Sequence, residues 1–235
     1  MKKKLLSAAV ITALSLSVVA QTKSPKNEGG FIIKGGVNRA NISVTDNGRV
    51  DEAKTLTSFH VGVGYDVPIA AGLSFQPGLL YTGKGAKTQV GQPNENFYYK
   101  ASSNPMYLEL PLNLVAKIPL GATAKLFVGA GPYAAMGVGG QNKVDLQILG
   151  AQSTSNKDIV FTNDDPTTAQ EENYGYGKIK RFDYGLNAQA GFEFSRVLVG
   201  ANYGYGLTKI NSGTDNTDND KGKHRVLSFS IGLKL

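Results

Sequence analysis

Apolar and polar residues alternate strictly along residues 181–207 of this chain. On the first half, the apolar positions are Phe182, Tyr184, Leu186, Ala188, Ala190, Phe192 and Phe194. After Ser195 and Arg196 the apolar set changes parity and becomes Val197, Val199, Ala201, Tyr203, Tyr205 and Leu207. A period of two is the period of a β-strand, and a change of parity across a tight turn keeps one face of a hairpin apolar. The pattern therefore predicts two paired strands with one apolar and one polar face.

The same alternation recurs over most of the chain. It covers residues 30–43, 55–67, 72–87, 104–118, 123–136 and 224–235, with the weakest contrast in 123–136. Together with the two strands above, these segments predict eight strands, and no segment shows a sustained period of 3.6 residues. We therefore expect an all-β fold.

The connections between these segments alternate in length. Residues 68–71, 118–122 and 195–196 form short connections, whereas 44–54, 88–103, 139–178 and 211–223 form long ones. In an up-and-down sheet this order places every short turn at one end and every long loop at the other. An even number of strands with that asymmetry is typical of an outer-membrane barrel. We predict an eight-stranded antiparallel up-and-down transmembrane β-barrel with short periplasmic turns and long extracellular loops.

The amino terminus supports export. Residues 1–20 combine three lysines, an apolar run and small residues before Gln21, which is the layout of a secretory signal peptide. An N-terminal membrane anchor is the alternative, but the run is shorter than the roughly 20 residues a spanning helix needs. The expected organisation is a signal peptide over 1–20, a short segment over 21–29 and a barrel domain over 30–235.

A soluble eight-stranded barrel, such as a lipocalin, would show the same alternation with the apolar face turned inward. Three features favour the membrane version. The polar face is rich in glycine and carries few charges, several strands exceed the 9–11 residues that cross a bilayer, and aromatic residues lie near the short turns. The aromatic residues are Tyr65, Phe75, Phe192 and Phe194.

Composition removes several function classes. The chain has no cysteine, which excludes disulfides and thiolate metal sites. Its net charge of +7 includes the three lysines at 2–4, and no basic cluster interleaved with aromatic residues predicts nucleic-acid binding. Asp215, Asp218 and Asp220 are spaced as in a calcium loop, but Gly222 comes one residue late, so a solvated loop is the preferred interpretation. No metal and no cofactor are expected.

The runs IIKGGVNRANIS, SFHVGVGYDVPIAAGLSFQPGLLYTGKGAK, YLELPLNL, KLFVGAGPYAAM, FDYGLNAQAGFEF and LVGANYGYGLTKI carry a family resemblance. The chain resembles the PorT-like outer-membrane β-barrel family of Bacteroidota-type bacteria over nearly all of its length after residue 20. The resemblance implies an eight-stranded barrel in the cell outer membrane, and one lineage of the family takes part in protein secretion and gliding. Outer-membrane lipid, lipopolysaccharide and the barrel-assembly machinery are the partners that such a protein meets. An extracellular or periplasmic protein partner stays open, and a monomer is expected.

Charged residues on the polar face are the candidate functional residues. They are Lys34, Lys84, Glu109, Lys117, Arg181, Asp183 and Glu193. An eight-stranded barrel has an interior that side chains can fill, and buried charges of opposite sign are expected to pair there. The set therefore predicts a structural network that plugs the lumen, with a narrow gated conduit as the alternative.

Catalysis would require a nucleophile and a base. The only histidines are His60 and His224, and Ser58 and Ser228 share their predicted inward face. No spacing defines a triad, so we predict no enzyme and no catalytic residues. The leading hypothesis is a structural or loop-mediated interaction role in the outer membrane. A narrow transport or secretion-associated component and a lipid-modifying enzyme are the alternatives.

Overall fold

The computed structural model describes residues 29–46, 49–52, 54–93, 95–162, 178–208, 210 and 222–235. The predicted signal peptide and Asp215, Asp218 and Asp220 lie outside these residues. The described part of the chain contains thirteen strands, and no helix there is long and apolar enough to span a membrane.

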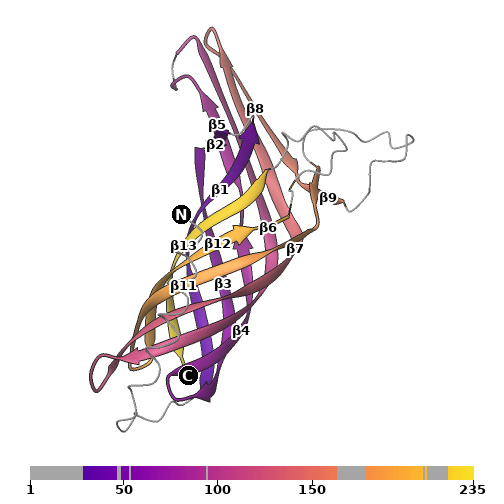
Figure 1. The fold of residues 1–235 in the computed structure, drawn as a ribbon. Helices are drawn as coiled ribbons and strands as arrows, with labels where there is room; N and C mark the ends of the chain where they lie inside the picture. The colour runs from indigo at the N-terminus through magenta and orange to yellow at the C-terminus, as the bar shows by residue number, and fades with distance from the viewer. Residues whose placement is uncertain are drawn as a thin grey trace.

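Eight of the strands close into a barrel (Figure 1). They are β1 (Gly30–Asp46), β3 (Lys54–Ala70), β4 (Leu73–Gly83), β6 (Phe97–Pro119), β7 (Ala124–Ile148), β11 (Phe182–Phe194), β12 (Val197–Gly206) and β13 (Lys223–Lys234). Each pairs antiparallel with the next one in the series, and β13 pairs with β1, so the ring has no open edge. The predicted fold class is confirmed.

The two faces of the strands separate as the alternation predicts. Along β11 the odd positions from Asp183 to Glu193 face inward and are mostly buried, whereas the even positions are exposed on the outside. The outside forms a belt of large apolar side chains, and the inside is polar and glycine-rich. An exposed apolar belt around a polar interior is the arrangement that a lipid environment requires.

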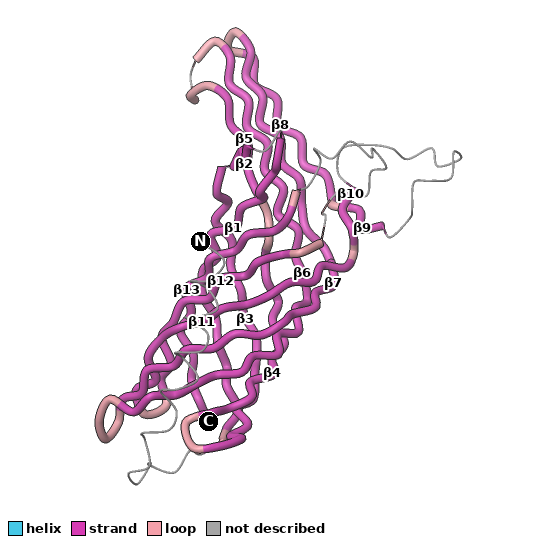
Figure 2. Tube along the Cα trace, in the orientation of Figure 1, coloured by secondary structure: helices cyan, strands magenta, loops and turns pink. Residues whose placement is uncertain are grey.

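The barrel continues on one side into a sheet that projects beyond the ring (Figure 2). This projecting sheet consists of β5 (Ala86–Val90), residues 97–104 of β6, residues 141–148 of β7 and β8 (Ala151–Asp158). The sequence predicted loops over 88–103 and over 139–178, and those predictions are wrong where these strands lie. The cause is local, since Val144, Leu146 and Ile148 alternate with polar residues only over a short stretch and β8, exposed along its whole length, carries no alternation.

Three short strands lie at the same end of the barrel. β2 (Arg49–Glu52) pairs with β1, and β9 (Val160–Thr162) pairs with β10 (Lys178–Lys180) in parallel. Next to β9 and β10, the side chains of Ile159, Ile179 and Ile210 are buried in one cluster, against which Ile42 and Phe161 pack. This cluster covers the barrel mouth at the end with the long connections.

Inward-facing glycines give the aromatic side chains of the lumen their space. A Cβ on Gly185 would lie 2.4 Å from Cε1 of Tyr133, and one on Gly191 would lie 2.6 Å from Cζ of Phe127. The rings of Tyr133 and Phe127 therefore occupy the space left by glycines on the paired neighbouring strand β11. This explains the glycine content of the polar face.

Gly185→Ala is expected to lower the free energy of unfolding by about 1–3 kcal/mol, because the new methyl group would lie 2.4 Å from both the Tyr133 ring and the Tyr205 carbonyl oxygen. Gly204→Ala is the matched control, since its Cβ would meet no heavy atom closer than 3.5 Å. Urea unfolding of the refolded protein in detergent measures both. Equal stability of the two variants would contradict the packing argument.

Candidate functional site: the closed lumen

A cluster of charges fills the lumen at the end with the short turns. This short-turn cluster consists of Asp66, Lys117, Glu193 and Lys234, which come from β3, β6, β11 and β13. Asp66 is fully buried, and its Oδ2 accepts hydrogen bonds from Nζ of Lys117 and, at 2.7 Å, from Nζ of Lys234. Glu193 lies 3.5 Å from Lys117 and 3.7 Å from Lys234. Two carboxylates and two ammonium groups therefore join four strands across the barrel.

A second cluster closes the lumen nearer the mouth. This mouth cluster consists of Lys84, Glu109, Asp183 and Tyr133. Nζ of Lys84 lies 2.7 Å from Glu109 Oε2 and 2.9 Å from Asp183 Oδ2. The Tyr133 hydroxyl donates a 2.9 Å hydrogen bond to the same Asp183 oxygen, and Lys84 Nζ lies 3.9 Å from the centre of the Tyr133 ring. All four side chains are buried, so the ammonium group has its counterions inside the protein.

Aromatic and apolar side chains cover the mouth cluster. The Tyr107 hydroxyl lies 3.3 Å from Nε2 of His224, and both residues are almost fully buried. Phe161 packs edge-on against the Tyr107 ring at 5.6 Å between centroids. The isoleucine cluster follows, so the lumen passes from charged to aromatic to aliphatic layers toward the mouth.

A relay of hydrogen bonds lies between the two charged clusters. Nε2 of His60 is 2.8 Å from the Ser230 hydroxyl, and Nδ1 is 2.7 Å from Oδ1 of Asn38. Ser228 donates to the same Asn38 oxygen at 2.8 Å. Hydroxyl, imidazole and orienting amide follow the order of groups in a serine hydrolase.

The surroundings of this relay do not suit catalysis. Ser230 lines two lumen cavities with volumes of about 60 Å³ and 30 Å³. Each has room for a few water molecules but not for an acyl substrate. His224 bonds Tyr107, and neither histidine forms a hydrogen bond with a carboxylate among the described residues. The relay is best understood as a way of satisfying buried polar groups.

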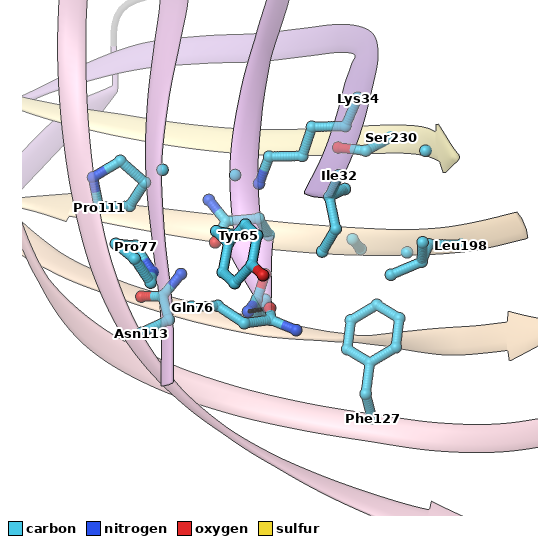
Figure 3. Close-up of a pocket in the computed structure, with 17 residues that line it drawn as sticks. Ile32, Lys34, Tyr65, Gln76, Pro77, Pro111, Asn113, Phe127, Leu198 and Ser230 are labelled. Atoms are coloured by element: carbon cyan, nitrogen blue, oxygen red, sulfur yellow. Dashed lines mark hydrogen bonds between the residues drawn. The ribbon is translucent and has the colours of Figure 1, made fainter. Parts of the chain in front are cut away.

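The larger cavity is lined by apolar side chains, several amide side chains and one lysine (Figure 3). Lys34 lies against both cavities, together with Asn113. Lys34 forms no ion pair with the described residues. Water in these cavities can solvate its ammonium group, which distinguishes Lys34 from the lysines of the two clusters.

The predicted lumen residues thus fall into three groups. Lys84, Glu109 and Asp183 meet in the mouth cluster, Lys117 and Glu193 meet in the short-turn cluster, and Lys34 lies between the clusters. Arg181 does not face the lumen. It lies just before the first residue of β11, its side chain is exposed, and its Nη2 donates to the Phe161 carbonyl oxygen at 3.4 Å. The strand parity that placed it inward does not apply outside the strand.

Two members of the short-turn cluster were absent from the predicted set. Asp66 and Lys234 both lie on the polar face of their strands by parity, so the alternation itself contained the signal. Each is close to the end of its strand, where a side chain can equally reach the solvent. Their burial depends on Lys117 of β6 and Glu193 of β11, whose charges meet theirs inside the lumen.

A closed eight-stranded barrel with an apolar outside and a plugged polar inside defines an integral outer-membrane protein. Residues 19–212 match the family model described as outer membrane protein beta-barrel domain, and the chain belongs to that family. The protein is accordingly located in the cell outer membrane. The short turns are periplasmic, and the mouth and the projecting sheet are extracellular.

Solved structures of other outer-membrane proteins are similar to this chain. They include the attachment invasion locus protein Ail of Yersinia pestis, with 14% identity over 88% of this chain and 99% of Ail and a TM-score of 0.38. Neisserial surface protein A has 13% identity over 89% and 100%, with a TM-score of 0.42. OprG from Pseudomonas aeruginosa has 15% identity over 88% and 96%, also with a TM-score of 0.42. No curated protein sequence matches the chain.

Proposed function

We propose that this protein is a non-conducting outer-membrane barrel that acts through its extracellular surface and has no enzymatic activity. The closed lumen carries this proposal. A solute crossing the barrel would have to separate Lys117 from Asp66 and Lys84 from Asp183, and then displace the layer of Tyr107 and Phe161. Each step would leave a buried charge without its counterion, which costs free energy in a narrow interior.

The projecting sheet supports the interaction role. Cross-strand partners in β5, β6 and β7 point to the same face of the projecting sheet, and one of its two faces carries the apolar side chains. They are Val90, Phe97, Tyr99, Val144, Leu146 and Ile148. Its outer strand β8 is exposed along its whole length and pairs only with β7 among the described strands. We expect an extracellular protein partner with an extended segment that adds to β8.

Membership of the PorT-like group is a finer proposal, supported by the sequence runs quoted above. A secretion-associated role would be shared with the lineage of that family that takes part in protein secretion and gliding. It would require the periplasmic turns or the projecting sheet to contact other proteins of the secretion machinery. The closed ring needs no second copy to satisfy its strand edges, which supports a monomer. Insertion by the barrel-assembly machinery is expected for any protein of this architecture.

Planar-bilayer conductance of the refolded protein without residues 1–20 tests the closed lumen. The wild type is expected to be silent, and Arg181→Gln, which changes a charge outside the lumen, should stay silent too. Lys84→Met should remain closed or open only rarely, because the short-turn cluster still fills the lumen. Discrete channels in the wild type that change with Glu109→Gln but not with Arg181→Gln would overturn the proposal and favour a transport role.

A further inference from the structure

Two arginines lie side by side on the outside of the barrel, above its apolar belt. Arg39 of β1 pairs in register with Leu227 of β13, and Arg225 follows two residues farther toward the mouth. Their outward-facing Cβ atoms are therefore diagonal neighbours, about 7 Å apart. Along the adjacent strands the outward positions near them hold no carboxylate among the described side chains.

The Arg225 guanidinium is held in a fixed orientation. Its Nη1 donates to the carbonyl oxygens of Gly206 and His224, each at 2.8 Å, and its central carbon lies 3.6 Å from the centre of the Tyr205 ring. The other N–H groups have no protein acceptor among the described residues. A planar group with free paired donors is suited to a phosphate. Arg39 is exposed beside it and adds a second cation.

The height of the pair matches the head-group level of a lipid leaflet. From Leu235 at the periplasmic end to Arg225, β13 runs for about ten residues, and a strand tilted by about 40° rises roughly 25 Å over that length. This is about the height of the apolar belt of an outer-membrane barrel. The arginines therefore lie where the polar head groups of the outer leaflet begin.

A groove in the lipid-facing surface lies below the arginines. It is shallow and open, holds about 460 Å³, and its lining includes the small residues Gly35, Ala190 and Ala201. Phe192 and Phe229 also line it, and Phe229 of β13 lies between Val37 of β1 and Ala201 of β12. Val37 also lines the groove and lies two residues below Arg39 on the same face of β1, so the groove leads up to the cationic pair. Its apolar lining suits an acyl chain.

From these two features we infer that the outer face of β1, β11, β12 and β13 binds one phosphorylated lipid of the outer leaflet. Its phosphate lies between Arg39 and Arg225, and one of its acyl chains lies in the groove. The inference rests on the outer-membrane location and is independent of whether the lumen conducts. A conducting barrel would leave it intact, and a silent barrel would not support it.

Native mass spectrometry of the refolded protein, titrated with bisphosphorylated lipid A, tests the site. The double variant Arg39→Gln with Arg225→Gln is expected to bind at least about tenfold more weakly, because charge-assisted hydrogen bonds to phosphate contribute at least this factor. Lys143→Gln with Lys157→Gln removes the same charge from the projecting sheet and should bind as the wild type does. Heat-modifiable migration on a gel confirms that each variant is folded.

Two further experiments distinguish the contribution of the lipid phosphate from that of the acyl chain. Ala201→Leu fills the groove without altering charge and is expected to weaken lipid A binding several-fold, because an acyl chain loses its place. Lipid A without its phosphates should lose affinity to the same extent as the double arginine variant. Equal binding of the dephosphorylated lipid, or equal binding of the double variant and its lysine control, would overturn the inference. Displacement of lipid A by millimolar inorganic phosphate would show a free-anion site and also overturn it.

Discussion

Lys84→Met is expected to lower the free energy of unfolding by about 3–5 kcal/mol, one of the two largest effects of a single substitution in this barrel. Lys84 is the only cation within 4.0 Å of Glu109 and Asp183 among the described residues. Methionine retains the length of the side chain but leaves two buried carboxylates without a positive charge. Tyr133 and Asn187 still donate to these carboxylates, but neutral donors do not replace an ammonium group.

Two further variants serve as controls for this prediction. Lys143→Met removes a half-exposed lysine whose Nζ is 3.4 Å from Asp145 and should cost no more than about 1 kcal/mol. The triple variant Lys84→Met, Glu109→Gln and Asp183→Asn removes all three charges and should recover most of the lost stability, since no buried charge remains unpaired. Equilibrium urea unfolding in detergent, followed by circular dichroism, measures all three. A loss for Lys84→Met as small as that for Lys143→Met would contradict the role assigned to the mouth cluster.

Asp66→Asn is expected to cause a comparable loss, about 3–5 kcal/mol, at the periplasmic end. Asparagine has nearly the same shape, but it removes the negative charge that Lys117 and Lys234 share. Glu193 then lies against both lysines at longer distances. The excess positive charge is in the interior, where solvent cannot screen it effectively.

The part of the barrel that is destabilised distinguishes this prediction from the first. Lys234 pairs in register with Ile32, so the short-turn cluster lies where the last strand closes the ring on the first. Hydrogen exchange in Asp66→Asn is expected to rise first in the periplasmic half of β1 and β13. In Lys84→Met it should rise first near the mouth, in β4 and β6. Identical exchange patterns in the two variants would mean that the clusters do not stabilise separate parts of the barrel.

Strand alternation was sufficient to predict the barrel because the two faces of each strand lie in different environments. One face meets lipid and the other a polar interior, so the period of two persists through β11, β12 and β13. The prediction failed where that condition ends. The projecting sheet lies outside the membrane, where β8 is exposed along its whole length and shows no period of two.

The candidate site was only partly predictable for a related reason. Parity tells which face a side chain is on, but not how far along the barrel it lies or what it meets across the lumen. Asp66 was overlooked near a strand end although it is fully buried, and Arg181 was included although its residue precedes β11. The outer arginines and the groove below them gave no sequence signal, because they combine residues of four strands.

The sequence by itself determined the number of barrel strands, their inward and outward faces, the asymmetry of the two ends and thereby the membrane in which the protein resides. These properties follow from local alternation and from the lengths of connections. Only the tertiary structure decided which charges pair and that their pairs close the lumen. Lys84 and Asp183 are 99 residues apart, and Lys234 and Asp66 are 168 residues apart. Such partners meet only when the ring closes and its curvature and register bring strands that are not hydrogen-bonded neighbours to the same height.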